Sequence, residues 1–267
     1  MAKTKESFSP LTLAAIDAAL EAGDLLKKGF GTRFSVSSKW GSHNLVTEYD
    51  RRSEAFLLKF LSREVKGSRF VAEESGQSGK GAEVLWYVDP LDGTVNFAHQ
   101  IPVFAVSIAA EVDGQMVSGV VYAPMLQELF VAERGKGAFL NGKKLAVTKT
   151  KELKETILAT GFPYNIKDNP NHCIEHFEDI LKLGIPIRRL GSAAIDLSYV
   201  AAGRVDGFFE VSLAPWDVGA GMLLVEEAGG KITGWNKKTL KIMDKGPVLA
   251  TNGHIHGDLA KMLSRAI

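Results

Sequence analysis

Two aspartates stand three positions apart where an apolar segment ends, in residues 86–97 (WYVDPLDGTVNF). Pro90 fixes its own φ and biases Asp89 away from the helical conformation, while Gly93 permits a tight turn and close approach of a ligand. Such a turn can aim the carboxylates of Asp89 and Asp92 at one point. Oxygen ligands of this kind suit a hard cation such as Mg²⁺.

Two neighbouring groups add to the chemistry of this turn. The Leu91 carbonyl can point to the same place as the carboxylates, and Thr94 can open a helix whose free N–H groups favour a phosphate. The D-x-x-D-G motif also has an ordinary interpretation, because aspartate and glycine are common in strand-to-helix turns with a cap. The motif alone does not decide between a ligand site and a turn.

Other acidic residues follow apolar segments elsewhere. Glu73 and Glu74 end one such segment in residues 71–76 (VAEESG), and Asp217 stands at the expected start of a helix in residues 214–217 (APWD). Each also suits a plainer role, as a solvated loop pair or as a charge at a helix N-terminus. Buried like charges at one site repel strongly unless cations neutralise them. A cluster of these carboxylates would therefore imply a metal, if the fold brings them together.

One histidine pattern points to a different chemistry. Residues 172–176 (HCIEH) match the H-x-x-E-H motif of zinc peptidases. Asn169 and Pro170 should begin this helix, so the histidines fall in its first turns, and no third zinc ligand is evident. We interpret both histidines as exposed helix residues. Cys173 has no partner set for a nucleophile, so an inert thiol is the better interpretation.

A second pattern nearly matches a phosphate-binding loop. Residues 137–144 (GAFLNGKK) lack the final Ser or Thr that binds Mg²⁺ in a P-loop, and no helix follows. Asn141-Gly142 is instead typical of a type I′ hairpin turn between two strands. No site for a nucleoside triphosphate is implied.

The elements that must position these residues follow from periodicity and turn signals. Ser9-Pro10 predicts a helix start with Pro at its first position, and Thr47 predicts another. The turn signal Asp113-Gly114 indicates an antiparallel meander over residues 103–132. Short buried strands are expected at Val71 and at residues 84–88. Later strands (156–160, 185–190, 207–211, 247–251) should alternate with helices (171–183, 193–202, 217–228) in an α/β pattern.

Length and composition fit a globular enzyme with one active site. The 267 residues are 45% apolar and 24% charged, with a net charge of +1, which gives no footprint for nucleic acid or a membrane surface. One cysteine excludes an internal disulfide, and no apolar run approaches the roughly 20 residues of a membrane span. We expect a cytoplasmic protein. Residues 1–145 should form an N-terminal α+β half and residues 146–267 an α/β half, which share one site as a single catalytic unit.

Several segments together resemble the inositol monophosphatase family, in the same order and at similar separations. The resemblance covers roughly residues 10–255, and residues 188–192 (RRLGS) look most like its bacterial branch. It implies a layered αβαβα sandwich of the inositol monophosphatase and fructose-1,6-bisphosphatase type, and a homodimer. The segments are residues 72–75 (AEES), 86–97, 135–145 (GKGAFLNGKKL), 191–210 (GSAAIDLSYVAAGRVDGFFE) and 215–230 (PWDVGAGMLLVEEAGG).

The resemblance implies two or three Mg²⁺ ions per active site. Glu73, Asp89 and the Leu91 carbonyl would hold the first. Asp89, Asp92 and Asp217 would hold the second, with Asp89 bridging the pair as in other two-metal sites. A third, weaker ion would depend on Glu73 and waters.

It also implies catalytic roles for Glu73, Thr94 and Asp50, of which the last two would orient the attacking water. Asp50 equally suits a capping box with Thr47. Asn44 stands where the family usually has Asp, which puts the third ion and sensitivity to Li⁺ in doubt.

The substrate contacts implied by the resemblance come from both halves of the chain. Glu210 would accept hydrogen bonds from hydroxyl groups, although a surface charge at a strand end is the plainer interpretation. Ser192 also suits a helix N-cap. Lys39 matches a family lysine, and a solvated lysine suits it nearly as well. The implied contacts are Asp92, Gly93, Thr94, Gly191, Ser192, Ala193, Glu210 and Asp217.

The sequence therefore predicts a Mg²⁺-dependent phosphomonoesterase that hydrolyses myo-inositol monophosphate with a metal-activated water. The alternatives that keep this mechanism are fructose 1,6-bisphosphate, 3′-phosphoadenosine 5′-phosphate and histidinol phosphate as substrates. A different alternative is a protein-binding role on the same fold.

Overall fold

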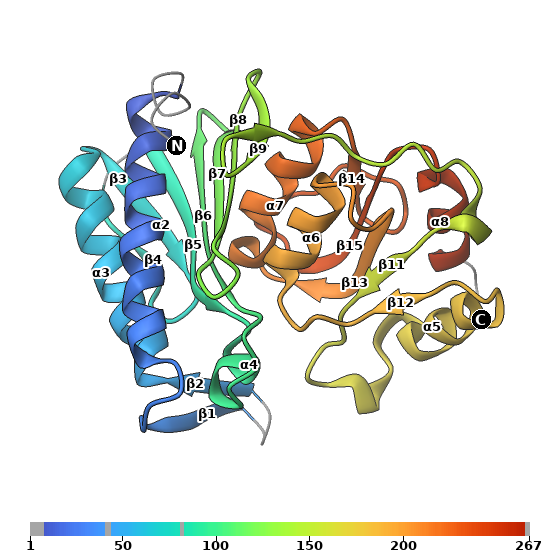
Figure 1. The fold of residues 1–267 in the computed structure, drawn as a ribbon, viewed down its shortest axis with the longest axis horizontal. Coiled ribbons are helices and arrows are strands. Elements are labelled where there is room, and N and C mark those ends of the chain that lie inside the picture. Colours follow the sequence, from blue (N-terminus) through green and yellow to red (C-terminus); the bar gives the residue numbers. More distant parts are fainter. Residues whose placement is uncertain (1–7, 41–43, 81–82, 265–267) are drawn as a thin grey trace.

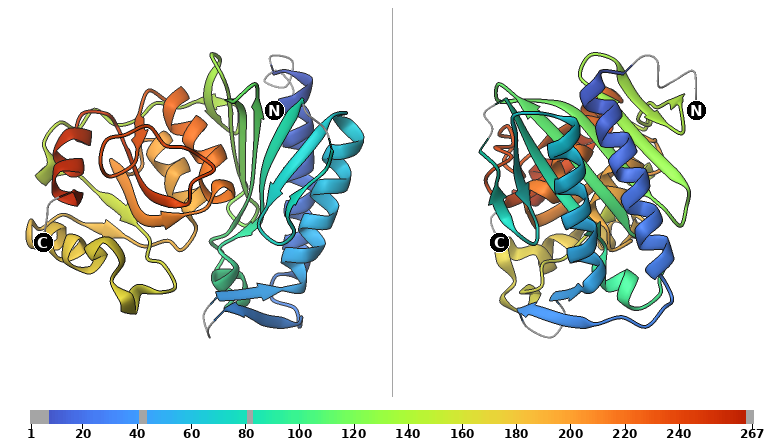
Figure 2. Two further views of the ribbon diagram at one scale, coloured as in Figure 1. Left: turned by 180° about the vertical axis from the view of Figure 1, so that it is seen from behind. Right: turned by 90° about the vertical axis from the view of Figure 1, so that its left-hand side faces the viewer.

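Five layers make up the protein, as the left-to-right order of elements in Figure 1 shows. The structure is a computed structural model that describes residues 8–40, 44–80 and 83–264. Two helices pack on the outer face of an eight-stranded sheet, and two more pack on its inner face. A five-stranded sheet and two further helices complete the stack, which Figure 2 shows from behind and from the side. The predicted layered sandwich is confirmed.

The outer layer comes from the N-terminal part of the chain. Helix α2 (Pro10–Gly29) begins after Ser9, whose side chain accepts a hydrogen bond from the Thr12 N–H as an N-cap. The hairpin β1 (Val36–Trp40) and β2 (Asn44–Thr47) leads into helix α3 (Glu48–Glu64). Both predicted helix starts are confirmed. The residue types of the first turn were enough to predict each helix start, because a capping side chain accepts hydrogen bonds from backbone N–H groups a few residues away.

The eight-stranded sheet has the strand order β10-β9-β8-β7-β6-β5-β3-β4. Only the β3–β5 pair is parallel, and the predicted meander is confirmed as β6, β7 and β8. Asp113 and Gly114 both have positive φ in its first turn, and so do Asn141 and Gly142 between β9 and β10, as type I′ turns require. The strands are β3 (Ser68–Ala72), β4 (Gly76–Ser78), β5 (Val84–Asp92), β6 (Ala105–Val112), β7 (Gln115–Ala123), β8 (Glu128–Glu133), β9 (Gly137–Leu140) and β10 (Lys143–Lys144).

The five-stranded sheet has the order β12-β11-β13-β15-β14 and is mixed. Its short strand β14 was not predicted from the sequence. The strands are β11 (Leu158–Thr160), β12 (Ile187–Arg188), β13 (Gly207–Leu213), β14 (Lys231–Thr233) and β15 (Gly246–Thr251). The remaining helices are α4 (Thr94–Ala98), α5 (Cys173–Lys182), α6 (Ala193–Ala201), α7 (Pro215–Glu227) and α8 (His256–Leu263), with 3₁₀ turns at Leu153–Glu155, Ile166–Asp168 and Pro170–His172.

The segment around α5 differs from the sequence expectation. Asn169, Asn171 and His172 have positive φ, so the α-helix begins only at Cys173. His176 is buried, and its ring meets Trp235 edge-on with centroids 5.5 Å apart. The interpretation of His176 as an exposed helix residue is therefore wrong. An aromatic neighbour distant in sequence covers it, which helix periodicity does not reveal.

The eight-stranded sheet buries both of its faces in apolar cores. One core lies under α2 and α3, and the other lies between the sheet and helices α6 and α7. A Cβ placed on Gly119 of β7 would stand 2.7 Å from the carbonyl oxygen of Ala220 in α7. This glycine therefore lets the helix approach the sheet closely. None of the described helices is long and apolar enough to cross a membrane.

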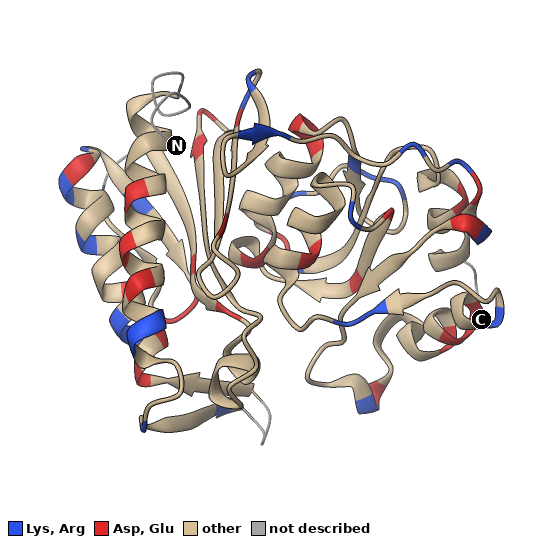
Figure 3. Ribbon diagram, viewed as in Figure 1, with Lys and Arg blue, Asp and Glu red and all other residues tan. Residues whose placement is uncertain are grey.

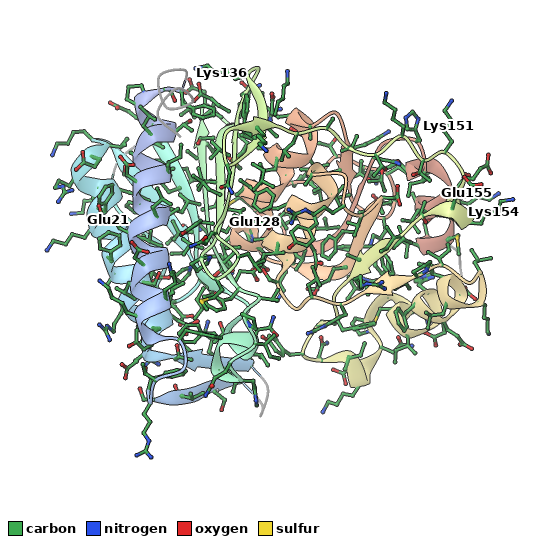
Figure 4. All side chains as sticks on the ribbon, in the orientation of Figure 1. Glu21, Glu128, Lys136, Lys151, Lys154 and Glu155 are labelled. Carbon is green, nitrogen blue, oxygen red and sulfur yellow. The ribbon has the colours of Figure 1, made fainter. Side chains whose placement is uncertain are left out.

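The connection between the two sheets runs over the outside of the molecule. Lys151, Lys154 and Glu155 project outward from it in Figure 4, at the far edge of the five-stranded part. The inner core draws residues from before and after this connection, among them Tyr87 and Leu224. The division of the chain into residues 1–145 and 146–267 stays a prediction.

Asn96 joins α4 to the second sheet's side of the molecule. Its Nδ2 donates to the Val103 carbonyl at 2.7 Å and to the Leu190 carbonyl at 2.8 Å, and the residue is 7% exposed. One amide thus holds two loops together, and the loop that contains Leu190 lies 94 residues from Asn96 in the sequence.

We expect Asn96→Ala to lower the free energy of unfolding by about 1–3 kcal/mol, because two partly buried carbonyls lose their donor. Urea denaturation measures this change. Gln115→Ala, an exposed position at the start of β7, is the control and should change stability by less than about 0.5 kcal/mol. Equal stability of the two variants would contradict the role of Asn96.

Candidate active site

The predicted turn after β5 departs from regular strand pairing. The register with β6 shifts between Asp89 and Asp92, and the Leu91 N–H donates to Asp89 Oδ1 at 3.0 Å. Gly93 follows with φ of 97°, a left-handed conformation that other residues rarely adopt. Helix α4 then begins at Thr94, as the sequence predicted. The turn thus carries two carboxylates at the end of a buried strand.

Thr94 lies between the turn and α3. Its Oγ1 is 2.8 Å from Asp50 Oδ1 and 3.0 Å from the Leu91 carbonyl oxygen. Asp50 also accepts hydrogen bonds from the N–H and hydroxyl of Thr47, which completes the capping box of α3. The helix cap and the contact with Thr94 therefore hold together. Burial raises the pKa of Asp50, and these hydrogen bonds oppose that rise.

Asp92 connects the first sheet to the N-terminus of α6. Its Oδ2 accepts hydrogen bonds from Ser192 Oγ at 2.5 Å and from the Ala194 N–H at 2.7 Å. Ser192 is also the N-cap of α6, since its Oγ accepts from the Ile195 N–H at 3.3 Å. Burial raises the pKa of Asp92, while these donors lower it. An aspartate of the first half is thus held by a helix start of the second.

Asp217 stands in the first turn of α7, where its Oδ2 accepts the Ala214 N–H at 2.7 Å. Burial, followed by the charges of Asp92 and Glu73, raises its pKa to about 8. The pKa of Asp89 lies well above its ordinary value because of burial and the charges of Glu73, Asp92 and Asp217. The fold therefore brings all four carboxylates within electrostatic range. Figure 3 shows acidic segments where strands of the large sheet end facing the second half.

Lys39 of β1 supplies a positive charge to this group. Its Nζ is 2.9 Å from Glu73 Oε1 and also contacts Glu74. Burial raises the pKa of Glu73 to about 7, against the opposing effect of Lys39. Lys39 is therefore paired with two carboxylates while it remains partly exposed to solvent.

Glu210 in β13 faces the same group from the five-stranded sheet. Burial, followed by the charge of Asp217, raises its pKa to about 8. Glu210 is half-buried in the middle of β13, beside the loop after β11, so its interpretation as a surface charge at a strand end is wrong. Gly191, with φ of 84°, lies next to Asn96 and Arg189 at the start of α6.

Comparison with known proteins agrees with this arrangement. A family model described as the inositol monophosphatase family matches residues 7–267. The chain belongs to the inositol monophosphatase family. Inositol-1-monophosphatase of Mesorhizobium japonicum is 40% identical over 262 residues, which cover 97% of this chain and 98% of that protein.

Two further relatives have a different name. Nus factor SuhB of Escherichia coli K12 is 45% identical over 226 residues, which cover 84% of this chain and 85% of that protein. The crystal structure of the extragenic suppressor protein suhB from Bartonella henselae has a TM-score of 0.91 at 39% identity, and the match covers 97% of this chain and 100% of that chain. The resemblance found in the sequence is thus confirmed for the family and its fold.

The oxygen atoms gathered at this site fit a divalent cation such as Mg²⁺, which the resemblance to the family implied. Carboxylates of β5, of α7 and of the turn after β3 lie within electrostatic range of one another at Asp89, and oxygen ligands are those that Mg²⁺ prefers. Among the described residues, no group of three or more His, Cys, Asp or Glu is arranged to hold a metal ion as it stands. Each carboxylate contacts a protein donor instead.

Two residues near the site were missed in the sequence. Tyr164, in the loop after β11, is 54% exposed, yet burial of its hydroxyl and the charges of Glu73, Asp92 and Asp217 raise its pKa to about 12. Asp196 in α6 is 2% exposed, and burial and the charges of Glu210 and Asp92 raise its pKa well above its ordinary value. Tyr164 follows a strand end, the usual place for site residues, and that signal could have found it. Asp196 gave no signal beyond an acidic residue within a helix.

The raised carboxyl pKa values make the stability of the metal-free protein depend on pH. Asp217 and Glu210 have pKa values of about 8 when folded, against about 4 in the unfolded chain. Between these values the folded protein holds protons that the unfolded chain has lost. Their contribution to stability is therefore fully present below about pH 4 and is lost as the pH rises through 8.

We expect the urea midpoint, measured in EDTA, to fall between pH 6 and pH 8.5, and Mg²⁺ to reverse much of this fall. Asp217→Asn removes one of the groups, so its midpoint should fall less. Asp113→Asn, in an exposed turn, is the control and should behave as the wild type does. A midpoint that rises with pH would contradict the electrostatic description of the site.

Proposed function

We propose that this protein is a Mg²⁺-dependent phosphomonoesterase whose substrate is a small polyol phosphate, with myo-inositol monophosphate as the leading candidate. One observation carries the proposal: the charges of Glu73, Asp92 and Asp217 all act on the buried carboxyl of Asp89 and raise its pKa, and those of Asp92 and Glu73 raise the pKa of Asp217. Divalent cations would remove this repulsion. Support for the substrate class comes from the relative named inositol-1-monophosphatase, which is similar over nearly the whole chain.

Mg²⁺ would be held by the four carboxylates and the Leu91 carbonyl, with two or three ions per site. When bound, the ions supply positive charge that stabilises the phosphate oxygens in the transition state. Asn44, in place of an acidic residue, weakens the third position.

Residues of the chain would hold the phosphate and the attacking water. Thr94 Oγ1 donates to Asp50 Oδ1, so the threonine oxygen can accept a hydrogen bond from a water while the Asp50 carboxylate takes up the proton that the hydroxyl passes on. The N–H groups of Gly93 and Thr94 stand at the start of α4, where helical bonding leaves them available to phosphate oxygens. Lys39 would add a positive charge near the phosphate, because its ammonium group is paired with Glu73.

The second half of the chain would bind the rest of the substrate. Glu210 would be a half-buried acceptor for hydroxyl groups, and residues 191–193 form the start of α6 and the loop before it. The same mechanism would serve fructose 1,6-bisphosphate, 3′-phosphoadenosine 5′-phosphate or histidinol phosphate. A panel of phosphomonoesters assayed with Mg²⁺ decides among them, and inositol phosphate ranking among the poorest would reject our assignment.

A second candidate function is a protein-binding role. It is favoured by the relative named Nus factor SuhB, at 45% identity. We propose a homodimer for either function, which sedimentation analysis tests.

Replacement of Asp92 distinguishes catalysis from a binding role. We expect Asp92→Asn to lower kcat about 100-fold or more, because the charge needed for metal is lost, and even outer partners of metal sites are worth 10–100-fold. The fold should remain, because an amide oxygen can still accept from Ser192 and Ala194. Asp113→Asn is the matched control. Wild-type turnover by Asp92→Asn would refute the metal assignment.

Replacement of Thr94 tests the contact with Asp50. We expect Thr94→Ala to lower kcat about 100-fold, the usual scale of a lost general acid–base contribution. Thr94→Ser keeps the hydroxyl and should stay within about tenfold of the wild type. Steady-state kinetics at saturating Mg²⁺ measures both, and equal losses in the two variants would mean that packing, not the hydroxyl, matters.

A further inference from the structure

Gly161 lies against the carboxylate of Glu210. A Cβ placed on Gly161 would stand 2.0 Å from Glu210 Oε2, 2.5 Å from its Cδ and 2.9 Å from its Oε1. Atoms of real side chains do not approach so closely, so any other residue at this position must displace the carboxylate. The conflict involves only the far end of one flexible side chain among the nearest atoms.

Strand pairing fixes this contact. Strands β11 and β13 run parallel, with Leu158 beside Gly207 and Thr160 beside Phe209. One step further along both strands places Gly161 beside Glu210. The Thr160 hydroxyl donates to the Phe209 carbonyl at 2.7 Å and fastens the end of β11 immediately before this step. Gly161 is the first residue after β11, so the strand pairing that ends at Thr160 and Phe209 holds its position relative to Glu210.

The glycine is not required by its own backbone. Gly161 is not among the residues with positive φ, so an alanine could adopt its conformation without strain. A side chain at position 161 would instead occupy the space that the Glu210 carboxylate fills. Gly191 differs in this respect, because its φ of 84° already favours glycine.

We propose that Gly161 is a positioning residue that sets where the Glu210 carboxylate accepts hydroxyl groups, and thereby selects polyol phosphates over phosphate esters without such hydroxyls. The inference rests on the proposed phosphatase function. A site built to accept a substrate hydroxyl discriminates strongly against analogues that lack it, because the buried acceptor is then left unpaired. Displacement of the acceptor should remove that selectivity while the metal and phosphate groups stay in place.

The kinetic test compares two esters. We expect Gly161→Ala to raise KM for myo-inositol 1-phosphate about tenfold, with kcat/KM for 4-nitrophenyl phosphate within about twofold of the wild type. Gly257→Ala is the matched control, because a Cβ at Gly257 meets nothing within 4 Å. Parallel losses on both esters would overturn the proposal, since they would indicate damage to the phosphate site.

A double-mutant cycle separates positioning from general damage. Glu210→Ala should show the same loss of selectivity, and adding Gly161→Ala to it should have no further effect. Glu210→Asp retracts the carboxylate, so Gly161→Ala should cost less in that background. Additive effects of Gly161→Ala and Glu210→Ala would overturn the proposal.

A crystal structure of Gly161→Ala makes the test independent of any activity. We expect the Glu210 carboxylate to have moved away from position 161 while β11 and β13 keep their register. An unmoved carboxylate would overturn the inference whatever the substrate is. Failure of the proposed function would look different: the wild type would hydrolyse no phosphomonoester, while the displacement of Glu210 would still be observed.

Discussion

Carboxylates from several elements lie together in a small, largely buried volume, where their repulsion and desolvation cost free energy. Most contacts at the site reduce that cost. Burial and neighbouring carboxylates raise the pKa of Asp89 and Asp217 together. Without metal, the protein limits the repulsion with local donors: the Ala214 N–H for Asp217, and Ser192 with Ala194 for Asp92. These are weak substitutes for a divalent cation, because a neutral donor does not cancel a formal charge.

The same contacts that restrain the charges also join the two sheets. Asp92 belongs to β5, yet its donors lie at the start of α6. Asn96 binds carbonyls on both sides of the same junction. Loss of either contact would loosen the junction between the turn after β5 and the start of α6. Stability and function are therefore coupled here: the bonds that shape the site are also bonds that hold the layers together.

Local chemistry predicted those parts of the structure that short segments decide. The capping box at Thr47, the N-cap at Ser192 and the turns at Asp113 and Asn141 depend on neighbours within a few residues, and each appeared where expected. The burial of His176 could not be predicted, because it depends on Trp235, 59 positions later in the chain. Strand β14 was missed for the same reason, since three residues gain strand character only by pairing with β15.

The candidate site divides in the same way. Asp89, Asp92 and Gly93 were found because one turn motif carries all three. Their meeting with Asp217 and Glu210 could not be derived from spacing, since it requires two sheets to face one another; the family resemblance supplied it. The pairing of Lys39 with Glu73 and Glu74 is a contact across 34 and 35 residues. No local pattern distinguishes such a lysine from a solvated one.

This division suggests how one fold can serve several substrates. Asp89 and Asp92 stand on strand β5, and Thr94 and Asp217 stand at helix starts, all of which core packing fixes, so their geometry tolerates little change. Glu210 and Gly161 lie where the five-stranded sheet meets the site, and a single methyl group at position 161 is enough to displace the acceptor. In the proposed function, phosphate chemistry and substrate choice would belong to different sheets, and the second could vary while the charge balance of the first is preserved.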